Sequence, residues 1–291
     1  MKYDDGSAFR RALEDRLRAR SLQTGMTLTL LRKMVAFDRY LARLVNDQPG
    51  QWVLKGGLAL QLRLGAGSRT TKDIDVLLLD SGQDISTALR RAGAVELGDW
   101  FSFEVGDADA EPDAPGGKRY PLNAILDSRF FETFHVDVGV GDALIEPPDQ
   151  LATPELMAFA DIQPTIIPCY PLTQQIAEKL HAYTRLRHSG EGSRVKDFVD
   201  ILLMASLAGI QADRLHQAFE ATFLQRGTHQ LPRQLPQPPS SWVTTFNKLS
   251  KEVGAGYSSL DEAFQALQQF LNPILSDMPV TRWNPIDWEW D

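Results

Sequence analysis

Residues 52–79 of the chain are WVLKGGLALQLRLGAGSRTTKDIDVLLL, in which two apolar segments flank a leucine-rich stretch. The first segment, residues 52–54, is of strand type and runs into the pair Gly56-Gly57. The leucines that follow predict a helix ending at Gly65, and residues 71–79 predict a second strand. This order of strand, glycine pair, helix and strand predicts an α/β domain.

Two acidic residues stand two positions apart near the start of the second strand. Because side chains alternate along a strand, Asp73 and Asp75 should point to the same side. Two close carboxylates disfavour joint ionisation unless a cation lies between them, and magnesium accepts such hard oxygen ligands, often together with substrate phosphates. The pair predicts a magnesium site, although two solvated acids on a surface strand would give the same pattern.

The glycine pair predicts a place for a phosphate. Gly56 and Gly57 follow a strand and open a helix, where free backbone N–H groups and the helix dipole favour an anion. A tight turn that needs positive φ would also explain two adjacent glycines. Combined with the acidic pair in this order, the glycines predict a phosphate site beside a metal site.

A third carboxylate is expected on a neighbouring strand. Apolar residues alternate at Phe134, Val136, Val138 and Val140, which places Asp137 on the opposite, non-core face, where it can be the third metal ligand. His135 shares that face and is the weaker candidate. The stretch 106–118 is rich in Asp, Pro and Gly and predicts an exposed loop in which Lys118 and Arg119 are solvated, with substrate contact as the alternative.

The remaining segments define the expected organisation. Further strands are predicted at residues 100–105, 120–126 and 134–140, and helices within residues 9–45, 84–91, 172–186, 195–203, 215–224, 242–253 and 260–271. Ser193 is a plausible N-cap, and the tryptophan-rich end is expected to pack on its own domain. We therefore expect a helical lead-in over residues 1–50, an α/β domain over 51–168 and a helical domain over 169–291.

Composition limits the function classes. The chain has 291 residues and a net charge of −8, which disfavours extended wrapping of nucleic acid but allows contact with one end of it. Cys169 is the single cysteine, so an internal disulfide and a multi-cysteine zinc site are excluded. The sequence contains neither a membrane-spanning apolar segment nor a signal peptide at its N-terminus, which predicts a cytoplasmic protein without membrane partners.

Two motif blocks resemble the AbiEii/AbiGii-type nucleotidyltransferase toxins, a group that includes the MenT toxins. The first block is Lys55-Gly56-Gly57-x-Ala59-Leu60 followed by Arg69-x-Thr71-x-Asp73-x-Asp75. The second is Gln175-Ile176-Ala177-Glu178-Lys179-Leu180-x-Ala182 followed by Arg194-x-Lys196-Asp197-x-x-Asp200-Ile201. The resemblance extends from about Trp52 to Leu203. It implies a DNA-polymerase-beta-like nucleotidyltransferase fold, a mixed sheet with helices, plus a helical C-terminal domain.

The resemblance also implies an activity and its residues. It implies an enzyme that transfers nucleotides from an NTP to an RNA, with the tRNA 3′ end as the most plausible acceptor, and whose partner is a separately encoded antitoxin. Asp73, Asp75 and Asp137 would hold two Mg²⁺ ions. Nucleotide binding is predicted for Lys55, Gly56, Gly57, Lys179 and Lys196, and a catalytic role for Lys179, Asp197 and Asp200.

Other interpretations stay open at the level of sequence. Lys179 could be a snorkelling lysine, and the spacing of Lys196 and Asp200 would suit an ordinary ion pair on a helix surface. The acceptor could instead be an antibiotic hydroxyl or a protein side chain. A non-catalytic nucleotide-binding regulator is a further alternative, against which the intact Asp73, Asp75 and Asp137 set speaks.

Overall fold

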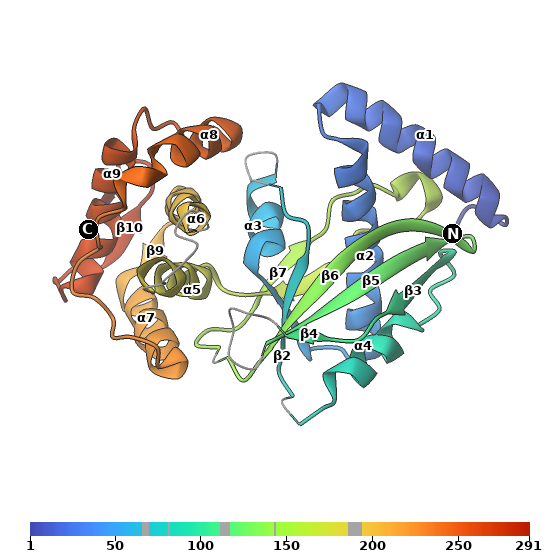
Figure 1. The fold of residues 1–291 in the computed structure, drawn as a ribbon, viewed down its shortest axis with the longest axis horizontal. Coiled ribbons are helices and arrows are strands. Elements are labelled where there is room, and N and C mark those ends of the chain that lie inside the picture. The colour runs from blue at the N-terminus through green and yellow to red at the C-terminus, as the bar shows by residue number, and fades with distance from the viewer. Residues whose placement is uncertain (66–69, 81, 111–116, 143, 186–193) are drawn as a thin grey trace. The chain divides into compact units, whose positions relative to one another are not determined.

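The computed structural model describes residues 1–291 except 66–69, 81, 111–116, 143 and 186–193 (Figure 1). The chain forms two compact units. The first comprises Met1–Arg63, Thr70–Gly141 and Pro148–Cys169, and the second comprises Leu64–Arg69, Asp142–Pro147 and Tyr170–Asp291. The three-part domain division stays a prediction, and the predicted N-cap Ser193 lies outside the described residues.

Two helices open the first unit, and capping residues set their ends. The Asp5 carboxylate accepts from the backbone N–H groups at the start of α1 (Gly6–Thr24), and Gly25 ends that helix with a left-handed φ of 73°. The Thr27 hydroxyl caps α2 (Leu28–Asp47). Both helices bury an apolar face in the core that they share with the sheet. The predicted lead-in is therefore an integral part of the first unit.

A mixed sheet forms the centre of the first unit. Its strand order is β3-β5-β6-β2-β1-β8-β7, with β4 paired to β5. The pairs β2–β6 and β1–β8 are parallel and the other pairs are antiparallel. The predicted α/β class is therefore confirmed. The strands are β1 (Trp52–Lys55), β2 (Ile74–Leu78), β3 (Phe101–Val105), β4 (Asp109–Ala110), β5 (Lys118–Leu126), β6 (Arg129–Val140), β7 (Asp149–Ala152) and β8 (Ile166–Cys169).

Alternation along the central strands separates a core face from a polar face. Val76 of β2 and Val138 of β6 are paired and fully buried, and Phe37 of α2 packs edge-on against Phe134 with ring centroids 5.1 Å apart. The packing of these buried residues fixes the register of the strands. The residues between them are therefore held in fixed positions on the opposite face of the sheet. The unit also contains α3 (Gly56–Leu64), α4 (Ile85–Gly93) and a short 3₁₀ helix (Ala158–Ala160).

Helices dominate the second unit, as expected, and a small sheet accompanies them. Among its described residues are α5 (Leu172–Thr184), α6 (Val195–Ala205), α7 (Ala212–Arg226), a 3₁₀ turn (Ser240–Trp242), α8 (Val243–Val253) and α9 (Leu260–Leu275). A small sheet joins β9 (Ile210–Gln211), β10 (Arg282–Asn284) and β11 (Glu289–Trp290).

The small sheet has a clear physical cause in the tryptophan-rich end. The Trp283 side chain is fully buried, packs on Phe270 of α9 and donates from its indole N–H to the Ala205 carbonyl at 2.7 Å. The expected packing of the chain end on its own domain is confirmed. Within the described residues, no helix is long and apolar enough to cross a membrane.

Candidate functional site

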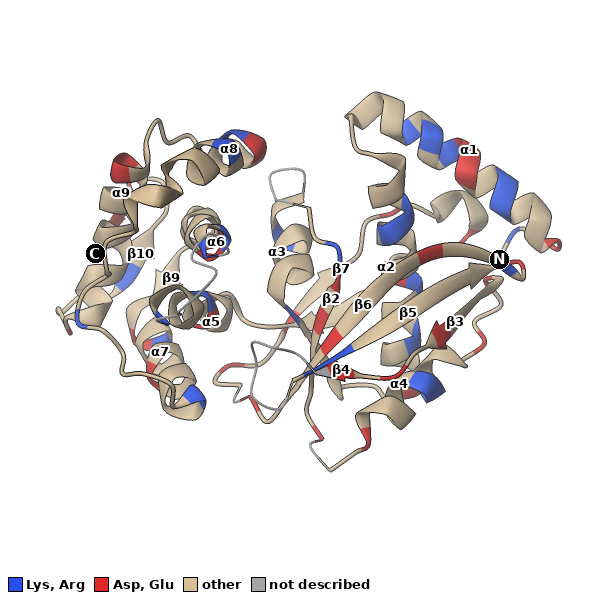
Figure 2. Ribbon diagram, in the orientation of Figure 1, with Lys and Arg blue, Asp and Glu red and all other residues tan. Residues whose placement is uncertain are grey.

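Four charged residues form a row across four neighbouring strands of the first unit. Lys55 of β1 is paired with Asp75 of β2, Asp75 with Asp137 of β6, and Asp137 with Arg119 of β5. Because directly paired residues project to the same face of a sheet, these four side chains share one face in the charge order plus, minus, minus, plus. Figure 2 shows the acidic segments of β2 and β6 close to the basic segment of β5.

The strongest contact in this row joins Arg119 and Asp137. The Arg119 Nε and Nη2 atoms donate to the two Asp137 carboxylate oxygens at 2.7 and 2.6 Å, and Nη2 also lies 3.6 Å from Asp73 Oδ2. Asp137 is only 6% exposed. The prediction of a solvated Arg119 in a loop is therefore wrong, because residues 118–126 form a strand that pairs with β6.

The backbone and ring of His135 hold Asp73 in place. The His135 N–H donates to Asp73 Oδ1 at 3.3 Å, and the ring Nδ1 lies 3.2 Å from the same oxygen. Asp73 directly precedes β2 and is partly exposed, so one of its oxygens faces His135 while the other faces Arg119. His135 thus orients a candidate ligand, which is a role that sequence reasoning did not assign to it.

The glycine pair lies against the Asp75 carboxylate. Gly56 has φ of 64°, and a Cβ built on it would lie 2.2 Å from Asp75 Oδ2. The Gly57 N–H donates to the same oxygen at 3.4 Å. Positive φ and this close approach explain why a residue without a side chain stands at position 56. The phosphate-binding roles of Lys55, Gly56 and Gly57 stay predictions.

The donor set of this face suits a divalent cation. Asp75 and Asp137 offer carboxylate oxygens from two adjacent parallel strands, and Asp73 adds another just before β2. Carboxylate oxygens are the ligand chemistry that magnesium prefers. As these side chains are placed, the described residues contain no group of three or more acidic, histidine or cysteine residues arranged to hold a metal ion. The Arg119 guanidinium instead supplies the positive charge beside Asp137.

A second charged cluster is buried in the second unit. The Lys179 ammonium of α5 lies 2.8 Å from Asp197 Oδ1 and 2.9 Å from Asp200 Oδ2, both on α6, and Arg194 also pairs with Asp197 at 2.8 Å. Asp200 is fully buried. The interpretation of Asp200 and Lys196 as a surface ion pair is therefore wrong. Lys196 is exposed, and among the described residues no ion pair joins it to Asp200.

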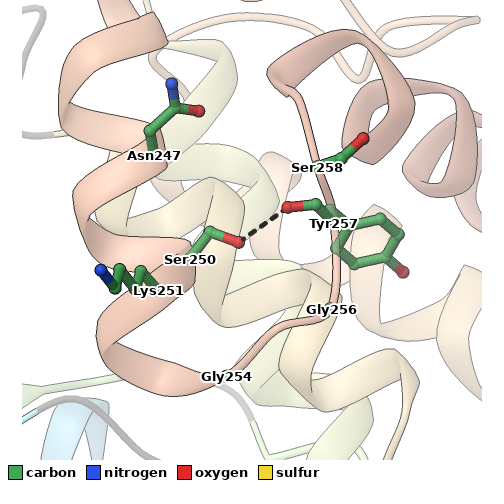
Figure 3. Close-up of a pocket in the computed structure, with 7 residues that line it drawn as sticks. All are labelled: Asn247, Ser250, Lys251, Gly254, Gly256, Tyr257 and Ser258. Carbon is green, nitrogen blue, oxygen red and sulfur yellow. Dashed lines mark hydrogen bonds between the residues drawn. The ribbon is translucent and has the colours of Figure 1, made fainter.

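Two other places in the described part of the chain lack the groups needed for metal binding or acid–base chemistry. Burial raises the pKa of the Cys169 thiol to about 12, so this cysteine is not poised as a nucleophile. A hollow of about 330 Å³ lies in the second unit between α8 and the turn before α9 (Figure 3). Its only charged lining residue is Lys251, and Ser250 donates to the Tyr257 carbonyl at 3.3 Å. Neither place offers a set of acids and bases.

A pair of histidines with rings in contact is a further titratable feature of the second unit. The rings of His181 and His229 lie 4.7 Å apart, and His181 Nε2 is 2.8 Å from the Thr228 hydroxyl. Burial, followed by the nearby His229, lowers the pKa of His181 to about 4, and burial also lowers the pKa of His229. Both rings are therefore neutral in the folded protein at neutral pH.

This histidine pair predicts acid sensitivity. Between pH 6.5 and 4 the unfolded chain binds a proton at His181 that the folded chain does not, so stability falls as the pH falls through this window. Replacing His181 by Gln should therefore destabilise the protein most at pH 7.5, and this penalty should shrink by about 2 kcal/mol at pH 4.5. Urea unfolding of both proteins at several pH values measures it. A penalty that is constant with pH would contradict the expectation.

The comparisons with known proteins point to one family. A family model described as nucleotidyl transferase AbiEii toxin, type IV toxin–antitoxin system, matches residues 39–278. MenT4, a nucleotidyltransferase toxin from Mycobacterium tuberculosis H37Rv, is similar with a TM-score of 0.55 and 17% identity, covering 91% of this chain and 98% of MenT4. This similarity confirms the predicted nucleotidyltransferase fold.

Another solved structure is less similar. An antigenic nucleotidyltransferase-like protein from Paracoccidioides brasiliensis has a TM-score of 0.40 and 14% identity, over 77% of this chain and 93% of that protein. This TM-score is too low to support a shared fold. A search of curated proteins finds no match.

Proposed function

The chain belongs to the nucleotidyl transferase AbiEii toxin family of toxin–antitoxin systems, and from this premise we propose that it transfers nucleotides from an NTP to the 3′ end of an RNA, namely tRNA. The transferase class follows from the family and is confirmed. The magnesium requirement, the RNA acceptor and the site residues belong to the proposal. A cognate antitoxin would be its protein partner, and the cytoplasm, which supplies NTP and tRNA, its location.

The observation that carries the proposal is the row of Lys55, Asp75, Asp137 and Arg119 on one face of the sheet. Asp73, Asp75 and Asp137 would hold the Mg²⁺ ions. Bound magnesium would favour deprotonation of the attacking hydroxyl and neutralise the pyrophosphate that leaves. The chain's own residues fix the carboxylates: His135 orients Asp73, and Gly57 donates to Asp75.

The second unit contributes a further set of candidate residues. Lys179 is held between Asp197 and Asp200, which fixes the position of its ammonium. We propose that Lys179 and Lys196 contact the triphosphate and that Asp197 or Asp200 has an orienting role. Lys196 is exposed on α6, which supports its proposed contact with the triphosphate.

A basic helix supports an RNA acceptor. Helix α1 has five arginines and two acidic residues in a chain whose net charge is −8, and Arg11, Arg16, Arg18 and Arg20 are exposed. The Arg16 guanidinium also lies 4.1 Å from the centroid of the Phe159 ring. Phosphate neutralisation by such arginines is the main source of affinity for nucleic acid. The matched family segment begins at residue 39, after α1.

A labelling experiment tests the proposal. The purified protein is incubated with Mg²⁺ and each α-³²P-labelled NTP in turn, together with total tRNA, with a mixture of aminoglycosides, or with a cell lysate treated with ribonuclease. We expect label on tRNA, and loss of that label when the tRNA 3′ hydroxyl has been oxidised with periodate. Label on a small molecule or on protein alone would contradict the RNA acceptor and identify the other transferase class.

A further inference from the structure

We propose that Arg119 is a positioning residue that alternates between two anions, the Asp137 carboxylate and the triphosphate of a bound nucleotide. While it is bound to Asp137, it competes with a divalent cation for that carboxylate. The inference rests on the proposed carboxylate site and deepens it. Its starting point is the two-bond contact of Arg119 with Asp137, at 2.7 and 2.6 Å.

The geometry makes the competition direct. Both oxygens of Asp137 accept from the guanidinium, and the same guanidinium reaches Asp73 Oδ2 at 3.6 Å. One positive group thus lies next to two of the three carboxylates that would bind the cation. The guanidinium occupies one lone-pair direction on each Asp137 oxygen. A cation bound to both oxygens would lie close to this positive group, and because the two positive charges repel each other, two-oxygen binding of the cation requires the guanidinium to move away.

The chemistry of arginine determines where the guanidinium can go. Its planar fork matches carboxylate and phosphate oxygens equally well, and it stays charged at any working pH. The Arg119 side chain is 38% exposed whereas the Asp137 side chain is 9% exposed. The guanidinium can therefore turn toward a ligand in solvent, while the carboxylate stays in the sheet. A triphosphate supplies the replacement acceptor.

If Arg119 alternates between the two anions, its removal changes the affinities for a cation and for a triphosphate in opposite directions. Without Arg119 the competitor of the cation is gone, so Mn²⁺ alone should bind about tenfold more tightly to Arg119→Gln than to the wild type. The triphosphate loses a charge-assisted contact, so Mn²⁺-tripolyphosphate should bind about tenfold more weakly. A purely structural Arg119 would shift both affinities in the same direction or neither. Both are measured by titration calorimetry without NTP or RNA.

Matched variants complete the experiment. Arg119→Lys keeps the charge but loses the two-bond fork, so both affinities should lie between those of the wild type and Arg119→Gln. Arg90→Gln is the control, because Arg90 is an exposed arginine of the same unit that pairs at 2.7 Å with Asp107, away from the row. Both of its affinities should equal those of the wild type. A thermal melt should show Arg119→Gln destabilised without Mn²⁺ and restored by saturating Mn²⁺.

The outcomes separate this inference from the proposed function. Asp137→Asn should weaken Mn²⁺ binding. If it does, and Arg119→Gln binds Mn²⁺ no more tightly than the wild type, or binds tripolyphosphate equally well, the alternation is overturned and the carboxylate site stands. If Asp137→Asn binds Mn²⁺ as the wild type does, Asp137 is not a ligand, and both the proposed site and the role of Arg119 are overturned.

Discussion

Asp75→Asn should abolish nucleotidyl transfer, by about a thousandfold or more, while the melting temperature stays within a few degrees of the wild type. Asp75 lies beside Asp137 in the sheet and accepts from Gly57, so its carboxylate is at the centre of the charged row. Asparagine keeps the shape but removes the negative charge and one oxygen. Incorporation of labelled NTP measures the activity, and circular dichroism measures the melt.

Asp80→Asn is the matched control for this variant. Asp80 follows the other end of β2, is exposed, and caps a local turn by accepting from the Gly82 N–H at 2.9 Å. Its activity should equal that of the wild type. Full transfer by a folded Asp75→Asn protein would remove the row from the catalytic site. If the protein is toxic, cells that express Asp75→Asn should also grow normally.

Replacing Lys179 by Met should lower the free energy of unfolding by about 3–5 kcal/mol relative to the wild type. The Lys179 ammonium is the shared partner of Asp197 and Asp200, and the latter is fully buried. Methionine preserves the length of the side chain but leaves two buried carboxylates without this cation. Urea unfolding at pH 7 measures the change, and loss of activity in this variant must be read per folded molecule.

Two variants separate the buried cluster from ordinary surface charge. Lys196→Met removes an exposed lysine that immediately precedes Asp197, and its stability should change by less than about 0.5 kcal/mol. Lys179→Met combined with Asp200→Asn should recover part of the lost stability, because one buried negative charge is removed with its partner. Equal stability of Lys179→Met and the wild type would show that the cluster is solvated and not structural.

Local patterns carried most of the correct predictions. Asp73 and Asp75 and the glycine pair could be placed because a period of two and a strand–glycine–helix order are properties of short segments. The alternation around Asp137 gave the correct face of β6. The alternation could not predict the burial of Asp137. That burial depends on the strand paired with the other edge of β6 and on the arginine which this strand carries.

The missed features all depend on residues that are distant in sequence. Arg119 follows a segment whose composition is typical of a loop. The sequence indicates that Arg119 lies in the strand only if the alternation of β5 is extended back from Tyr120. The strand β8 has the sequence Ile-Ile-Pro-Cys, which contains a proline and no alternation of apolar and polar residues, so its pairing with β1 is fixed by tertiary packing. The contact of Lys179 with Asp200 joins two helices, which a spacing rule for a single helix cannot detect.

The absence of a side chain at Gly56 has a consequence for mutations that inactivate the protein. Because a Cβ at this position would overlap the Asp75 carboxylate, and because φ there is 64°, every other amino acid at position 56 displaces the carboxylate. With Asp75 as the proposed metal ligand, codon changes that replace Gly56 should inactivate the enzyme as changes at Asp75 do. In a population selected to survive the toxin, escape alleles should accumulate at this glycine although it carries no functional group of its own.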